Sequence, residues 1–216
     1  MFRAKTTFEA MARDTSQGYL HSVSLFNDKQ RNLLFNKSFK SELQGYNAVE
    51  VLRHHANRAP TDDPLSLVQY MDMKTYLVGE ILTKVDRASM AHSLEVRVPL
   101  LDHKFVEWIS GLSPQMKLKG TEGKYIFKKP LEPHLTKDIL YRKKMGFGVP
   151  LASWFRGPLR EKVNTAILGE KLASTGMFNQ KYLKHLVDQH QSGVRDYSAP
   201  IWSLLMFESF LDRLDA

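Results

Sequence analysis

Apolar residues recur along this chain mostly at three- and four-residue spacing, whereas strictly alternating runs are scarce. Three- and four-residue spacing places side chains on one face of a helix, while alternation is typical of a half-buried strand. The pattern therefore predicts a mainly helical protein with short irregular connections and few strands.

The longest predicted helix covers residues 64–84, with Pro64 at its first position,. Another is predicted over residues 48–57, and one that Pro158 opens ends near Leu168,. Side chains able to cap further helices are Asp102, Thr121, Asn179 and Ser198,. In the last of these helices we expect the core face to contain Trp202, Leu205, Met206, Ser209 and Phe210,.

Residues 94–98 are the clearest alternating run. In an extended segment Leu94, Val96 and Val98 would face the core, and Glu95 and Arg97 would share the opposite face. Such a pair could orient a catalytic group or bind a substrate carboxylate. It could equally be an exposed ion pair of small energetic value.

Length and composition agree with an ordinary globular protein. The 216 residues, 43% hydrophobic and 25% charged, fit one domain or one large piece of a larger one,. Cysteine is absent, which excludes disulfides, thiolate zinc sites and a cysteine nucleophile,. No apolar run is long enough for a membrane helix or a secretion signal, so we expect a cytoplasmic protein without a membrane partner.

The net charge of +8 favours an anionic partner: nucleic acid, a phosphate-rich small molecule or an acidic surface,. Basic residues are densest over residues 117–144, where a solvated face is the default interpretation,. Lys124, directly after Gly123, could contact phosphate oxygens. Two further groups could bind anions or form charge networks: Lys84, Asp86 and Arg87, and then Arg142, Lys143 and Lys144 beside a glycine-containing loop,.

Motifs of several other enzyme classes are missing. Eight histidines are present, but His54 and His55 are adjacent and point to different sides of a helix, so we expect no metal site,. The chain also lacks a Walker lysine loop, a dinucleotide-binding glycine motif and a GxSxG elbow,.

Several motifs, in order and spacing, resemble the synthetase domain of glutamine-hydrolysing asparagine synthetases. They are YL at 76–77, LTKVDRASM at 82–90, SLEVRVPLLD at 93–102, GK at 123–124, FK at 127–128, RKKMGFGVP at 142–150, and Trp154. The resemblance is strong over residues 64–154 and weaker in the flanks. We expect residues 1–216 to form a single domain, or a fragment that is the C-terminal part of such a domain.

The resemblance implies an ATP-dependent amidotransferase that adenylates the side-chain carboxylate of aspartate. Ammonia released from glutamine by a separate N-terminal domain then displaces AMP, giving asparagine, AMP and pyrophosphate. ATP and Mg²⁺ would be the cofactors of the full-length enzyme. The family's fold is an adenine nucleotide α-hydrolase-like, or ATP pyrophosphatase, domain, of which this chain would be a helical portion.

The family's SGGxDS loop and SGEGxDE motif do not occur in these residues. We therefore expect a fragment without the nucleotide-binding parallel sheet, inactive alone and with no cofactor bound. Its partners would be the glutaminase domain and the ATP-binding half of the same polypeptide, and self-association through the uncovered surface is a further expectation.

The resemblance also suggests roles for particular residues. Lys124 matches the lysine that neutralises charge on pyrophosphate, and Glu95 matches an acidic position that supports the catalytic site. Arg97 would anchor Glu95 or a substrate anion, and Lys84, Asp86, Arg87 and Lys144 are further candidates for binding substrate or pyrophosphate. Two alternatives stay open: an amidotransferase acting on a sugar, peptide or secondary metabolite, and, from another class, a basic helical module that binds nucleic acid.

Overall fold

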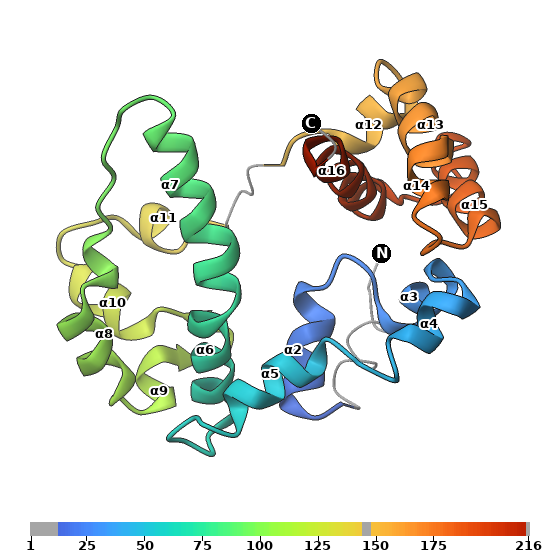
Figure 1. Cartoon of the computed structure of the whole chain (residues 1–216). Coiled ribbons are helices and arrows are strands. Elements are labelled where there is room, and N and C mark those ends of the chain that lie inside the picture. The colour runs from blue at the N-terminus through green and yellow to red at the C-terminus, as the bar shows by residue number, and fades with distance from the viewer. Residues whose placement is uncertain (1–12, 144–147, 215–216) are drawn as a thin grey trace. The chain divides into compact units, whose positions relative to one another are not determined.

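The computed structural model describes residues 13–143 and 148–214, and these residues are mostly helical (Figure 1). They divide into two compact units. Unit 1 contains residues up to Leu20 and from Ala48 to Met145, and unit 2 contains His21 to Asn47 and the residues from Gly146 onward. The prediction of a mainly helical chain is confirmed. Within the described ranges, no helix has the length and apolarity needed to cross a membrane.

The sheet of the described residues is a two-stranded antiparallel hairpin in unit 1. It pairs β1 (Leu118–Lys119) with β2 (Glu122–Gly123), with Leu118 opposite Gly123 and Lys119 opposite Glu122. Thr121 lies in the turn of this hairpin, so the prediction that it caps a helix is wrong. The next helix, α10 (Tyr125–Lys128), begins after Lys124 instead.

Unit 1 begins with α2 (Thr15–Val23), whose last three residues belong to unit 2. It continues with α5 (Val49–Ala56), which confirms the helix predicted at residues 48–57, and α6 (Pro64–Lys74). Asp63 caps α6 by accepting a hydrogen bond from Ser66 N–H at 2.8 Å, and Pro64 occupies the first turn as predicted,.

The helix predicted over residues 64–84 is interrupted at Thr75. The Thr75 backbone leaves the helical region, with φ −128° and ψ −82°, and its hydroxyl donates to Met71 O at 2.7 Å. A side-chain hydroxyl that bonds to the preceding turn competes with the backbone ladder. Beyond it the chain continues as a π-helix, η1 (Leu77–Leu82), and then α7 (Thr83–Met90), almost end to end in Figure 1.

The remaining elements of unit 1 are short. Asp102 caps α8 (His103–Ser110) through hydrogen bonds from Lys104 N–H and Phe105 N–H, as predicted, and Gly111 ends the helix. The other short elements are η2 (Pro99–Leu101), α9 (Pro114–Lys117), η3 (Lys129–Leu131) and α11 (Lys137–Leu140).

Burial is sparse in unit 1. The buried side chains lie where α2, α5 and α6 meet, and include Tyr19, Leu52 and Met71. Tyr19 O–H donates to Asp72 Oδ1 at 2.6 Å, and burial together with this bond raises the pKa of the tyrosine. From Lys74 to Lys143 the only buried side chain is Lys117. Residues 94–98 have no regular secondary structure, and Leu94, Val96 and Val98 are exposed, so the prediction that they face the core is wrong.

The hydrophobic core of the described residues lies in unit 2. It is built mainly by α12 (Leu151–Arg156), α13 (Arg160–Leu168), α14 (Glu170–Ser174), α15 (Gln180–Gln191) and α16 (Ser198–Leu214). The fully buried side chains of this core include Phe155, Val163, Ile167, Leu172, Leu183, Leu186 and Ile201. Burial of this much apolar surface is the main source of stability that the structure offers.

Two helices from the N-terminal region complete unit 2. They are α3 (Asp28–Leu34) and α4 (Lys37–Glu42), capped by Asn27 and Asn36 respectively. Backbone hydrogen bonds from Asn36 N to Met177 O, at 2.9 Å, and from Asn179 N to Leu34 O, at 2.8 Å, join them to the residues before α15. Asn179 caps α15 as predicted, while α13 begins at Arg160, two residues after Pro158.

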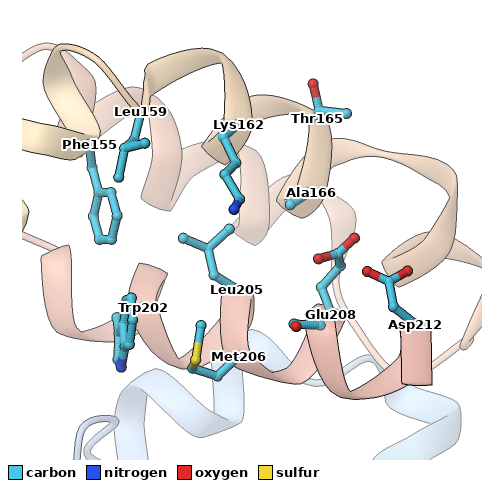
Figure 2. A pocket seen from close by; sticks show the side chains of 11 residues that line it. Phe155, Leu159, Lys162, Thr165, Ala166, Trp202, Leu205, Met206, Glu208 and Asp212 are labelled. Carbon is cyan, nitrogen blue, oxygen red and sulfur yellow. The ribbon is translucent and has the colours of Figure 1, made fainter. Parts of the chain in front are cut away.

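In the last helix, α16, several residues predicted to lie in the core are exposed. Leu205 is buried, but Trp202, Met206 and Phe210 are exposed, so assigning all of them to the core was wrong. Figure 2 shows Trp202 and Met206 lining a pocket of about 460 Å³ between α13 and α16. Ser198 is the first residue of α16, and Asp196 accepts a hydrogen bond from its N–H at 2.9 Å.

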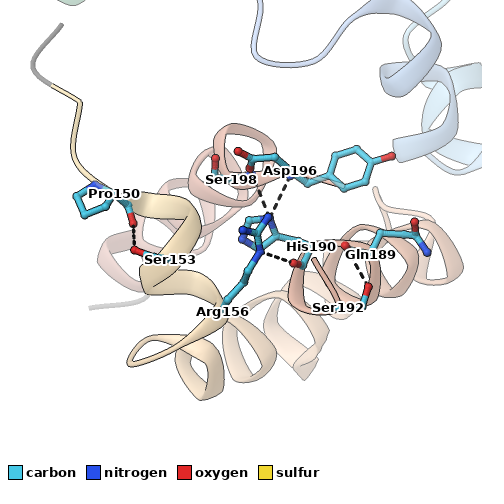
Figure 3. Close-up of polar contacts among 9 residues, drawn as sticks. Pro150, Ser153, Arg156, Gln189, His190, Ser192, Asp196 and Ser198 are labelled. Carbon is cyan, nitrogen blue, oxygen red and sulfur yellow. Dashed lines mark hydrogen bonds and ion pairs between the residues drawn. The ribbon is translucent and has the colours of Figure 1, made fainter. Parts of the chain in front are cut away.

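A histidine is fully buried in this core (Figure 3). His190 Nδ1 accepts a hydrogen bond from Tyr197 N–H at 3.1 Å, so the ring is neutral with its proton on Nε2,. Arg156 Nε donates to His190 O at 2.8 Å and joins α12 to the end of α15. Burial, followed by the nearby Arg156 charge, lowers the pKa of His190,.

Candidate functional site

Lys124 lies between the hairpin and α10 in an unusual backbone conformation. Its φ of 59° and ψ of 33° place it in the left-handed region. A residue with a side chain adopts this conformation at a cost of about 1–2 kcal/mol, so the surrounding structure must impose it. Hydrogen bonds from Phe127 N–H and Lys128 N–H to Lys124 O, at 3.0 and 2.9 Å, hold the turn.

Lys124 contributes to the lining of a cavity of about 450 Å³ in unit 1. Most of the lining is apolar and comes from α6, α8 and α10, including Val68, Phe105, Val106, Ile109, Ile126 and Phe127. The charged side chains that line it are Lys117, Lys124 and Asp72. Apolar walls with a few polar groups are typical of small-molecule sites, which usually measure roughly 300–1,000 Å³.

Lys117 is the buried member of this group, with only 9% of its surface exposed. Its Nζ donates to Ser110 O at 3.2 Å and lies 3.5 Å from Gln69 Oε1, and both acceptors are neutral. No ion pair joins it to a carboxylate among the described residues. The pKa of Asp63 is lowered mainly by the hydrogen bond from Ser66 N–H and, to a smaller extent, by attraction to Lys117.

The next two lysines after Lys124 form ion pairs with nearby glutamates. Lys128 forms an ion pair with Glu122 of the hairpin, and its Nζ lies 5.0 Å from the centre of the Tyr141 ring. Lys129 Nζ lies 2.7 Å from Glu132 Oε2. By contrast, Lys124 forms no ion pair with any described residue, so its charge is not compensated by them.

Glu132 has two side-chain partners among the described residues, Lys129 and Tyr141. It accepts a hydrogen bond from Tyr141 O–H at 2.7 Å in addition to the contact with Lys129. The Lys129 hydrogen bond, followed by that from Tyr141, lowers the pKa of Glu132, and the bond to Glu132 raises the pKa of Tyr141. The basic run over residues 117–144 is thus only partly a bare cationic surface.

Glu95 and Arg97 form the ion pair that their alternation suggested, with Arg97 NH2 2.5 Å from Glu95 Oε1. The side chains are 69% and 86% exposed, respectively. A pair this accessible contributes at most about 1 kcal/mol to stability. Neither residue lines the cavity that contains Lys124, so the structure does not bring the two parts of the predicted site together.

The remaining candidates lie on or near α7. Lys84 Nζ is 3.8 Å from Glu80 Oε1, an exposed pair one helical turn apart,. Asp86 and Arg87 are exposed and form no ion pair among the described residues. Lys144 lies outside the described residues, as do Met145, Gly146 and Phe147. The roles of Lys84, Asp86 and Arg87 in binding substrate or pyrophosphate stay predictions.

A model of the asparagine synthase family matches residues 2–212, which takes in both units. The chain belongs to this family. Asparagine synthetase 1 (glutamine-hydrolysing) of Bacillus subtilis is 28% identical over 205 residues, or 95% of this chain and 32% of that protein. A putative glutamine-hydrolysing asparagine synthetase of Mycobacterium tuberculosis is 34% identical over 145 residues, or 67% of this chain and 22% of that protein.

A third relative has a different name: the amidase chyE of Penicillium rubens is 28% identical over 133 residues, covering 58% of this chain and 20% of that protein. The chain spans about a third or less of the length of these relatives. No solved structure matches it significantly. The family model and these relatives confirm the resemblance to the asparagine synthase family that the sequence motifs indicated.

Sequence reasoning missed several features of this family member's site. Lys117, Glu122 and Tyr141 were not singled out, although Lys117 lines the cavity and the other two contact Lys128. The basic run and the motifs at 123–124 and 127–128 pointed to this region but not to these three residues, because nothing in a linear pattern distinguishes a buried lysine from a solvated one. The described residues contain no group of three or more His, Asp or Glu side chains placed to hold a metal ion.

Proposed function

We propose that this chain is the helical portion of a synthetase domain that adenylates a carboxylate and transfers ammonia to it. Family membership supports the amidotransferase class. The structural observation that carries the proposal is the setting of Lys124. This lysine lies in a strained turn and has no carboxylate partner among the described residues. In the proposed reaction the product is asparagine when the acceptor is aspartate.

In the proposed first step, a carboxylate oxygen of the acceptor attacks the α-phosphorus of ATP and pyrophosphate leaves. Negative charge builds on the leaving group as the bond breaks, and a fixed ammonium nearby lowers the energy of that transition state. Lys124 supplies such a group. The turn that holds its backbone reduces the reorganisation needed when the charge develops, and Lys128 and Lys129 are engaged by Glu122 and Glu132.

In the second proposed step, ammonia attacks the acyl carbon of the adenylate, AMP leaves and the amide forms. The ammonia would come from glutamine through a glutaminase domain. Glu95 and Arg97 are proposed to support the site rather than to react, because each engages the other in an exposed ion pair. Mg²⁺ would accompany ATP, but the described residues contain no cluster suited to hold it, so we assign it no ligand in this chain.

We further propose that an ATP-binding half with the SGGxDS loop covers part of unit 1. Exposed apolar side chains are numerous between Tyr76 and Trp108, and include Val78, Val85, Met90, Leu94, Val96, Val98, Leu100 and Leu101. Exposed apolar surface on this scale usually marks an interaction site. The relatives are about three or more times longer than their matched regions, which supports such a partner in the same polypeptide.

A second acceptor class has one observation in its favour. Proteins named as amidases match 58% of this chain, alongside the asparagine synthetases. The acceptor carboxylate could therefore belong to a sugar, a peptide or a secondary metabolite instead of aspartate. Pyrophosphate release measured with aspartate and with such carboxylates, each supplied with ammonia, distinguishes the two.

The experiment that tests the proposal uses the intact enzyme that contains this chain together with its ATP-binding half. Replacing Lys124→Met should lower ammonia-dependent pyrophosphate release by about a hundredfold or more, the size seen when one preorganised donor is removed. The matched control is Lys119→Met, in the hairpin that precedes Lys124; the Lys119 Nζ lies 3.3 Å from Tyr125 Oη. Equal activity of the two variants would show that Lys124 has no role in the mechanism. As a separate expectation, this chain alone should release no pyrophosphate.

A further inference from the structure

The cavity of unit 1 contains a charge that none of the reaction steps proposed above uses. Lys117 is the last residue of the short helix α9, three residues after Pro114, and lines the cavity with only 9% of its surface exposed. An ammonium removed from water is stable only when hydrogen-bond acceptors or an opposite charge replace its hydration. Here two neutral oxygens, of Ser110 and Gln69, take that place at 3.2 and 3.5 Å.

Three donors are available on an ammonium, and these two contacts occupy at most two of them. Both distances are at the long end of the hydrogen-bond range, so neither bond is strong. No described carboxylate forms an ion pair with Lys117. Asp63 attracts Lys117 but forms no ion pair with it. An anion in the cavity would therefore supply a counter-charge in direct contact with this buried ammonium, and such charge-assisted hydrogen bonds are strong.

The other residues that line the cavity indicate what the uncharged part of such an anion would be. Val68, Phe105, Val106, Ile109 and Phe127 form walls against which an apolar chain or ring would be removed from water,. The formal charges of the lining are those of Lys117, Lys124 and Asp72, which sum to +1. Asp72 is also held by the hydroxyl of Tyr19 at 2.6 Å. A net charge of +1 suits a monoanion better than a phosphate dianion.

We propose that this cavity binds an amphipathic carboxylate, with the carboxylate at Lys117 and the apolar body between α6, α8 and α10. Lys124, at the rim of the same cavity, provides a second attractive charge. The proposal concerns binding alone. The contact with Lys117 does not depend on adenylation, because Lys117 belongs to none of the steps proposed above, whereas Lys124 is shared with the first of them.

The test is calorimetric titration of the chain with octanoate, using octanol and octyl phosphate as comparison probes. We expect octanoate to bind at least tenfold more tightly than octanol, since only the acid carries the charge. Lys117→Met should weaken octanoate binding at least tenfold and leave octanol binding nearly unchanged. Lys119→Met, which alters a lysine outside the cavity lining, should have no effect.

Methyl NMR locates the site independently. Ile109 and Ile126 line the cavity, so their methyl signals should shift with octanoate, whereas those of Ile167 and Ile201 in the core of unit 2 should not. If Lys117→Met does not fold, Val106→Trp provides a second route, because it fills the cavity without removing a charge. Octanoate binding that survives Val106→Trp, equal affinity for octanol, or tighter binding of octyl phosphate would each overturn the proposal.

Discussion

At the scale of single residues, the identity of the cation at position 124 should matter as well as its charge. In the intact enzyme, Lys124→Arg should recover only part of the activity that Lys124→Met loses, because a planar guanidinium does not reproduce a compact ammonium. A charge that acts on the transition state affects turnover and turnover over the Michaelis constant together. Steady-state pyrophosphate kinetics with ammonia measure both, and a change confined to the Michaelis constant would assign Lys124 to substrate binding instead.

His190 is a second residue with a measurable consequence. Its pKa in the folded state is lowered by burial, whereas in the unfolded chain it is expected near 6.5,. Between these two pKa values the unfolded chain binds more protons than the folded chain. The contribution of His190 to the free energy of unfolding is therefore complete above about pH 6.5 and decreases as the pH falls below it. Protonation at Nδ1 would also displace the hydrogen bond from Tyr197 N–H.

Urea unfolding of unit 2, followed from pH 7.5 to pH 5, tests this prediction. The contribution of Asp196 falls in a more acidic window, because the Ser198 N–H bond lowers the pKa of that carboxyl. An NMR titration of the His190 ring that gives a pKa at or above 6.5 would contradict the assignment.

At the scale of elements, Gly169 is required by the close approach between α13 and α14. A Cβ at this position would lie 2.2 Å from Thr165 O, an atom of the backbone that cannot move independently. Gly169→Ala should therefore destabilise unit 2 by about 1–3 kcal/mol, the usual cost of overpacking.

Gly79, in η1, is the matched comparison. A Cβ there would meet nothing within 4 Å, so Gly79→Ala should cost little or stabilise the chain by up to about 1 kcal/mol,. Thermal unfolding of the two variants measures the contrast. A Gly169→Ala variant as stable as the original chain would show that α13 and α14 are less closely joined than the structure indicates.

At the scale of the whole molecule, stability is distributed unevenly between the units. Unit 2 contains the hydrophobic core, whereas residues 74–143 of unit 1 bury only Lys117. Local opening is governed by how much apolar contact an element must lose. In hydrogen exchange, amides of α13, α15 and α16 should therefore be protected far longer than those of α7, α8 and α11, and equal protection would contradict this.

The exposed apolar residues of unit 1 predict a second whole-molecule property. At high concentration this chain by itself should self-associate, because apolar surface open to water favours contact between copies. Sedimentation velocity over a range of concentrations measures this. Strictly monomeric behaviour throughout would count against it, and addition of the ATP-binding half should suppress the association.

What could be predicted from the sequence was local in origin. Helical spacing, Pro64 and the capping residues Asp102 and Asn179 specify where helices begin, because a cap bonds to backbone groups only a few residues away,. The motifs around Glu95 and Lys124 identified the family for the same reason, since order and spacing are properties of the chain itself. The alternation of Glu95 and Arg97 likewise anticipated their ion pair.

Burial was decided only by the tertiary structure. Leu94, Val96 and Trp202 follow patterns typical of core residues and are exposed, while Lys117 and His190 are polar and buried. A pattern shows which side chains share a face, but what covers that face depends on contacts between residues distant in the chain. The break at Thr75, the left-handed turn at Lys124 and the cavity beside Lys117 arise in the same way, from the balance of backbone hydrogen bonds and packing in the folded state.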